Sequence, residues 1–171
     1  MSDQASRLVS SAGLVVGSAL GLAGTFVPSG AIRGLLWGLD GVALVVATAL
    51  LAIHHSRKGN EMVAGGFLIF VAGEALILST AAMDLAASGP VFGAGASLWA
   101  ASLILLSVPK VAVFWVRLVG VIAGLLFAIV ALQLFVGRGI TPLSQPLPFF
   151  AYPFLVATLF GWAWERYRSA A

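Results

Sequence analysis

Residues 62–86, MVAGGFLIFVAGEALILSTAAMDLA, form a long apolar stretch with one carboxylate, Glu74, near its middle and a second, Asp84, near its end. About 20 mostly apolar residues are enough to cross the hydrocarbon core of a bilayer as a helix. The stretch therefore predicts a membrane-spanning helix, and Glu74 marks a polar point inside it.

Similar apolar stretches fill the rest of the chain. Of the 171 residues, 61% are hydrophobic and 9% are charged, whereas a soluble domain carries roughly 25% charged residues. Glycine or proline punctuates the boundaries between the stretches, and no loop is long enough for a folded domain outside the membrane. We therefore predict a single polytopic membrane domain over residues 1–171, an all-α bundle of six transmembrane helices. The expected spans are residues 8–27, 34–53, 62–86, 92–108, 113–136 and 149–164.

Two of these spans have a second interpretation. The first could be a cleaved signal peptide, because Arg7 precedes it and small residues follow at 29–31. Asp3 and the length of the stretch favour an uncleaved helix. The sixth span contains Pro153, which predicts a kinked helix. The alternative is a re-entrant segment, which is tolerated only where protein covers its backbone.

The distribution of basic residues predicts the orientation. With six spans, seven of the nine Lys and Arg residues fall on the side of the two termini, and only Arg33 and Arg138 fall on the other. Short cytoplasmic loops carry an excess of Lys and Arg. We expect a multi-pass protein of the cell inner membrane with both termini in the cytoplasm.

Two internal symmetries fit the pattern of spans. In the first, a helix hairpin repeats three times, over residues 1–59, 60–110 and 111–171, and each hairpin opens with a glycine-spaced helix. In the second, two inverted halves of three helices align residues 27–28 with residues 108–109, as in many transporters. Because glycine and proline are common in membrane helices, both symmetries stay open.

The hairpin version carries one resemblance to a known family. With Leu39-Asp40-Gly41-Val42 in the second helix of the first hairpin, it resembles the small six-helix HdeD-type acid-resistance membrane proteins. The resemblance covers the helix count and about one helix of pattern, and no residue role is carried over from it.

Glu74 and Asp40 are the candidate intramembrane polar sites. Placing a carboxylate near the middle of a bilayer costs on the order of 3 kcal/mol by insertion scales, so such residues usually face the bundle interior. Loss of water disfavours the charged form, and we expect a neutral Glu74. It is either a proton, cation or ligand site, or a structural group that bonds a neighbouring helix.

Four further polar residues are expected on the outer side, where they could form a vestibule leading to Glu74. In that arrangement Asp40 would pair with one of two arginines, and Asp84 with the other. Alternatively, Asp84 and both arginines lie in interfacial water, and the glutamine bonds between helices. The predicted vestibule residues are Arg33, Asp84, Gln133 and Arg138.

The sequence offers no pattern for metal binding, catalysis or nucleic-acid recognition. His54 and His55 are adjacent, so their side chains diverge, and the i, i+4 spacing of a two-histidine site is absent; we expect a solvated pair. The chain has no cysteine, which excludes thiolate sites and disulfides. We predict no metal, no cofactor, no enzymatic activity and no nucleic-acid partner.

Two function classes survive. The first is a non-enzymatic membrane scaffold, accessory subunit or stress-related module. The alternative is a small proton-coupled transporter or channel-like protein that uses Glu74 and Asp40. The partners would be the lipid bilayer and a homo-oligomer or larger membrane complex. A wet cavity reaching Glu74 would favour transport, and a dry Glu74 bonded to one neighbour would favour the scaffold.

The proline-rich residues 141–150 are expected to be a lid over the outer face or a stiff connector.

Overall fold

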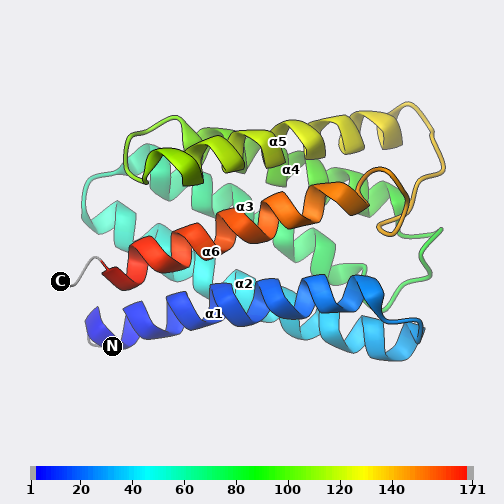
Figure 1. Cartoon of the computed structure of the whole chain (residues 1–171), viewed down its shortest axis with the longest axis horizontal. Coiled ribbons are helices and arrows are strands. Elements are labelled where there is room, and N and C mark those ends of the chain that lie inside the picture. The colour runs from blue at the N-terminus through cyan, green and yellow to red at the C-terminus, as the bar shows by residue number, and fades with distance from the viewer. Residues whose placement is uncertain (1–2, 169–171) are drawn as a thin grey trace.

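The computed structural model describes residues 3–168, and the regular structure in that range is entirely helical. The helices alternate in direction, each packs against the next in the chain, and α6 closes a ring by packing against α1 (Figure 1). They are α1 (Asp3–Phe26), α2 (Gly30–Arg57), α3 (Glu61–Ser79), α4 (Gly89–Ser107), α5 (Phe114–Phe135) and α6 (Tyr152–Arg168), with a short 3-10 helix, η1 (Phe149–Ala151), before α6.

The helices α1 to α5 are long and apolar enough to cross a membrane. The sixth, α6, has 17 residues and is shorter than the other five. The prediction of an all-helical membrane protein is therefore confirmed in this coarse form, while the sixth span and the orientation stay predictions. The beginning of α1 and the end of α6 lie at the same end of the bundle, which we call the terminal end (Figure 1). The opposite end is called the distal end.

The third helix ends earlier than its apolar stretch. We expected it to continue to residue 86, but α3 ends at Ser79. Beyond it, the Asp84 carboxylate accepts hydrogen bonds from the backbone N–H groups of Ala86 and Ala87, at 2.9 and 3.4 Å. Such side-chain bonds stabilise turns in competition with a helix. As a result, Glu74 lies in the last two turns of α3, nearer the distal end than we expected.

The proline of the last helix does not kink it. Pro153 lies in the first turn of α6, where a residue without a backbone N–H is well tolerated. The expected kink is therefore wrong, because the helix begins at Tyr152 rather than at residue 149. The residues before it form η1 instead.

Aromatic side chains fill the centre of the ring. They form a chain of ring contacts that begins near the terminal end and finishes at the start of α6. The successive centroid distances are 5.6 Å for His55–Phe67, 5.0 Å for Phe67–Trp162, 5.9 Å for Trp162–Phe70, 6.1 Å for Phe70–Trp99, 5.1 Å for Trp99–Phe127 and 5.8 Å for Phe127–Tyr152. We call these residues the aromatic column. Because of it, the middle of the ring is a packed core.

Glycines bring α1 and α2 into close contact. A Cβ atom at Gly17 would meet the Leu44 side chain, and one at Gly24 would meet the Trp37 ring. Small residues allow this close approach between membrane helices. The same glycine face of α1 accommodates Asp40 of α2, which brings its carboxylate into the interior of the ring.

Candidate functional site: a cavity around Asp40

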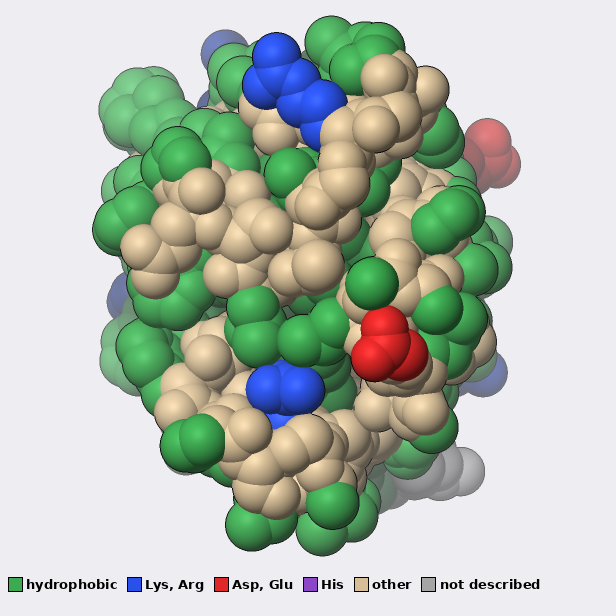
Figure 2. All heavy atoms as spheres, turned by 90° about the vertical axis from the view of Figure 1, so that its right-hand side faces the viewer, with side chains coloured by type: hydrophobic (Ala, Val, Ile, Leu, Met, Phe, Trp, Pro, Cys, Tyr) green, Lys and Arg blue, Asp and Glu red, His purple; other side chains and the backbone are tan. Residues whose placement is uncertain are grey.

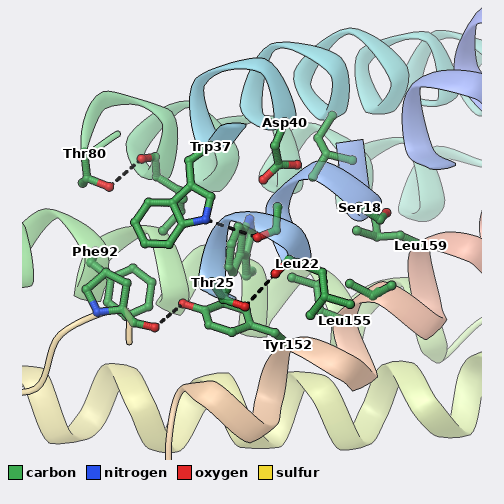
Figure 3. Close-up of a pocket in the computed structure, with 16 residues that line it drawn as sticks. Ser18, Leu22, Thr25, Trp37, Asp40, Thr80, Phe92, Tyr152, Leu155 and Leu159 are labelled. Atoms are coloured by element: carbon green, nitrogen blue, oxygen red, sulfur yellow. Dashed lines mark hydrogen bonds between the residues drawn. The ribbon is translucent and has the colours of Figure 1, made fainter. Parts of the chain in front are cut away.

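A cavity lies inside the distal half of the ring (Figure 3). It has about 60 Å³ of room for water-sized molecules, which is space for a few waters, since one water needs roughly 10–15 Å³ on this measure. Residues from α1, α2, α3, α4 and α6 enclose it, together with Pro142 from the loop before α6 and Thr80 just after α3.

Among residues 3–168, Asp40 supplies the only carboxylate that lines this cavity. Its side chain packs directly against Gly21 of α1, where a Cβ atom would collide with the carboxylate. The Oδ1 atom is buried and has no hydrogen-bond partner within residues 3–168. Burying a polar atom without a partner costs free energy, so this oxygen atom needs explanation.

Glu74 lies in a different environment. It is 1% exposed, and the indole Nε1–H of Trp99 on α4 donates a hydrogen bond of 3.1 Å to its Oε2 atom. Glu74 is not among the residues that line the cavity, although Trp99 is. A dry carboxyl bonded to one neighbouring helix is the arrangement expected for a structural role.

The hydrogen-bond donors in the cavity wall are all directed at protein acceptors. This holds for each hydroxyl and each indole that lines the cavity. Figure 3 marks those bonds whose two partners both line it, such as the bond from Tyr152 to Pro142. The bonds are Ser18 Oγ to Leu14 O (2.5 Å), Thr25 Oγ1 to Leu22 O (2.6 Å), Thr80 Oγ1 to Ile77 O (2.6 Å), Tyr152 Oη to Pro142 O (2.9 Å), Trp37 Nε1 to Gly21 O (3.2 Å) and Trp99 Nε1 to Glu74 Oε2 (3.1 Å). The hydroxyl oxygens keep lone pairs that can accept further bonds.

The predicted vestibule residues do not gather around Asp40. Arg33 and Asp84 line a separate shallow depression of about 720 Å³ between α2 and the loop after α3. The guanidinium carbon of Arg33 lies 5.6 Å from the centroid of the Trp37 ring. Trp37 lines both the depression and the cavity, so its ring separates them.

The expected ion pairs of the vestibule are absent. Within residues 3–168, neither Asp40 nor Asp84 forms a salt bridge with Arg33 or Arg138. Gln133 is half-buried and makes no side-chain hydrogen bond to another helix in that range. Figure 2 views the distal end and shows its basic and acidic side chains set apart among apolar and neutral ones.

A second cavity, of about 200 Å³, lies at the terminal end. His54 and His55 line it together with Lys58, Glu165 and Arg166. His54 Nε2 lies 3.2 Å from Arg166 Nη1, and His55 stacks on Phe67. Both histidines are half-buried, and our expectation of a solvated pair stays a prediction.

Neither cavity contains a cluster of metal ligands. Within residues 3–168, no three histidine or acidic side chains lie close enough together to hold a metal ion. The two histidines point to different neighbours, Arg166 and Phe67.

Residues 141–150 lie over the distal end of the ring. Pro142 lines the Asp40 cavity and Pro148 is fully buried. The Phe149 ring lies 5.6 Å from the Phe26 ring at the end of α1, while Phe150 remains 55% exposed. One residue of the segment, Pro142, therefore borders the cavity, and the lid and connector interpretations both stay predictions.

Our sequence analysis missed the aromatic residues of the site. Trp99 and Tyr152 both border the cavity, and Trp99 holds Glu74. The position of Trp99 in the sequence could have indicated that it faces the bundle. Tryptophan in membrane helices concentrates at the interfaces, whereas Trp99 is in the middle of an apolar span and therefore has to face the bundle.

Comparison with known proteins gives no relative. No family model, no curated protein and no solved structure matches this chain. The resemblance in hairpin pattern accordingly carries no argument, and the site is interpreted from its own geometry.

Proposed function

We propose that this chain is a small, non-enzymatic, multi-pass membrane protein that binds a small cation in the cavity around Asp40, in exchange for a proton. The observation that supports this most concerns Asp40, which lines the cavity and whose buried Oδ1 atom has no hydrogen-bond partner within residues 3–168. An ionised carboxylate left alone inside a membrane protein is costly. A proton or a bound cation removes that cost.

The two carboxyls, Glu74 and Asp40, support different function classes. Glu74, bonded to Trp99 and outside the cavity, matches the scaffold interpretation. Asp40 does not match it, because a purely structural carboxyl is expected to have a partner. The proposal therefore gives Glu74 the role of fixing α3 against α4, and gives Asp40 the role of binding a ligand.

A small proton-coupled transporter is the second candidate. The observation that favours it is the pair of cavities, one at each end of the bundle, with the aromatic column between them. In liposomes that contain a pH-sensitive dye, such a protein would move protons when a cation gradient is imposed. If it does not, the protein binds its ligand without transporting it.

Accessibility to charged thiol reagents tests the binding proposal. The chain has no cysteine, so a single one reports only its own position. Ser18 lines the cavity, and Ser102 is equally buried but bonds Gly66 O between α3 and α4. With small methanethiosulfonate reagents, S18C should react about tenfold faster with a cationic reagent than with an anionic one, and S102C should react with neither.

Two controls make this result specific. Adding D40N to S18C should abolish the preference for the cationic reagent, while adding D84N, which changes a carboxylate outside the cavity, should preserve it. Equal rates with both reagents in S18C, or rates no higher than those of S102C, would contradict a cation site at Asp40.

A further inference from the structure

We propose that the cavity around Asp40 selects small ammonium-type cations, namely ammonium and short primary alkylammonium ions, over alkali-metal cations. This inference rests on the proposed function and names the ligand class of the same site. It follows from three properties of the cavity wall: its hydrogen-bond character, its aromatic rings and its size.

The wall offers acceptors and no free donors. Every hydroxyl and indole proton that lines the cavity is used in a bond to a protein oxygen, as described above. The acceptors that remain are the lone pairs of the hydroxyl oxygens and the carboxylate of Asp40, whose Oδ1 atom has no partner within residues 3–168. A ligand that matches this wall must bring donors and positive charge, which an ammonium group does with each of its N–H bonds.

The rest of the wall is carbon, and much of it is aromatic. Trp37, Phe92, Trp99 and Tyr152 all line the cavity, and it has no basic residue. Aromatic faces attract organic cations and ammonium groups. An alkali-metal ion instead needs protein oxygens that replace its water shell, and this wall has few of them. The chemistry therefore favours an N–H cation.

The size of the cavity limits the ligand. About 60 Å³ of room for water-sized molecules accommodates a few small groups. Methylammonium, which is little more than a methyl group beside a water-sized ammonium group, fits that limit. Tetramethylammonium is larger and has no N–H donor, so it should bind poorly. For so small a ligand we expect a dissociation constant on the order of a few millimolar.

Methylammonium chloride is the probe that tests this inference. The purified full chain in nanodiscs is compared in about 100 mM methylammonium, ammonium, potassium, sodium or tetramethylammonium chloride, a concentration in excess of the expected dissociation constant. Two quantities are measured: the melting temperature and tryptophan fluorescence, to which Trp37 and Trp99 of the wall contribute. Methylammonium and ammonium should raise the melting temperature and change the fluorescence saturably, and the other three salts should not.

Carboxylate variants connect the result to the site. D40N should weaken methylammonium binding about tenfold or more, because the charged partner is lost, and the matched variant D84N should leave it unchanged. An unchanged affinity for methylammonium in D40N would overturn the inference.

The remaining outcomes separate the inference from the proposed function. If potassium or sodium stabilises the wild type but not D40N, and methylammonium does not, the ammonium selectivity is wrong and the cation site stands. If no salt changes the melting temperature or the fluorescence in a manner that depends on Asp40, both the ammonium selectivity and the cation site are wrong.

Discussion

At the residue scale, two carboxyls of neighbouring helices have different environments. Glu74 is held by the indole of Trp99, and Asp40 lines a cavity and has a buried Oδ1 atom without a partner among the described residues. A buried hydrogen bond contributes only about 0.5–1.5 kcal/mol net, whereas an unpaired buried group costs about 1–3 kcal/mol. The absence of a partner at Asp40 is therefore more informative about function than the bond at Glu74.

Replacement of Glu74 tests its structural role. In E74Q the side-chain carbonyl can still accept the Trp99 hydrogen bond, so the free energy of unfolding should change by less than about 1 kcal/mol. In E74L the indole N–H loses its acceptor, and we expect a loss of about 1–3 kcal/mol. E74K should damage membrane insertion, since Lys is among the costliest residues at such a depth. Thermal unfolding in detergent measures the first two changes, and the yield of inserted protein measures the third.

A double-mutant cycle gives the control. If Trp99 is the partner that matters, the costs of E74L and W99F should not add. A loss in E74Q as large as that in E74L would mean that Glu74 is ionised in the folded protein, against our expectation of a neutral group.

At the element scale, the glycine face of α1 positions the binding carboxylate. Gly21 leaves room for the Asp40 side chain, and the Gly21 carbonyl accepts the Trp37 indole bond. The spacing of these glycines in the sequence suggested close helix contact. It did not indicate that one of them faces a carboxylate.

A pair of glycine variants tests this packing. G21A places a methyl group against the Asp40 carboxylate, and overpacking of this kind costs about 1–3 kcal/mol. G38A is the matched control, because nothing lies within 4 Å of a Cβ at Gly38. Alanine is the better helix former by about 0.8–1.0 kcal/mol, so G38A should be neutral or slightly stabilising. Melting temperatures of the two variants in the same detergent measure the difference; equal values would show that α1 and α2 are further apart than described.

At the scale of the whole molecule, ring closure brings together the first and last described helices. Arg166 of α6 is 5% exposed, and its Nη2 atom lies 3.6 Å from Asp3 Oδ1 of α1. Both residues lie at the terminal end, as do Arg57 at the end of α2 and Lys58 and Lys110 in the connections between helices. The chain ends themselves lie outside the described residues.

Reporter fusions test the orientation. We expect a fluorescent protein fused at residue 1 or residue 171 to be active, and alkaline phosphatase at those positions to be inactive, because basic loops remain in the cytoplasm. A phosphatase inserted at Gly139, in the connection after α5, should be active. Opposite results at the two termini would contradict six spans, and a reversed pattern at all three positions would contradict the orientation alone.

The membrane class of this protein and the existence of its helices could be predicted from the apolar pattern alone. A membrane helix satisfies its own backbone hydrogen bonds, so an apolar run of sufficient length predicts it without knowledge of its neighbours. The burial of Glu74, the carboxyl near the middle of such a run, could be predicted as well. Helix ends were less predictable, because side chains of the connections determine them: Asp84 bonds the turn after α3, and Pro153 occupies the first turn of α6.

Which polar groups have partners, and which residues border a cavity, depends on how the helices pack together. Trp99 reaches Glu74 because α4 packs against α3, with Gly73 and Gly95 at their contact. Asp40 borders a cavity because α6 and residues 141–150 close the ring opposite it. These contacts depend on the rotation of each helix about its axis. That rotation is set by the packing of all six helices together, which the pattern within any one helix does not contain.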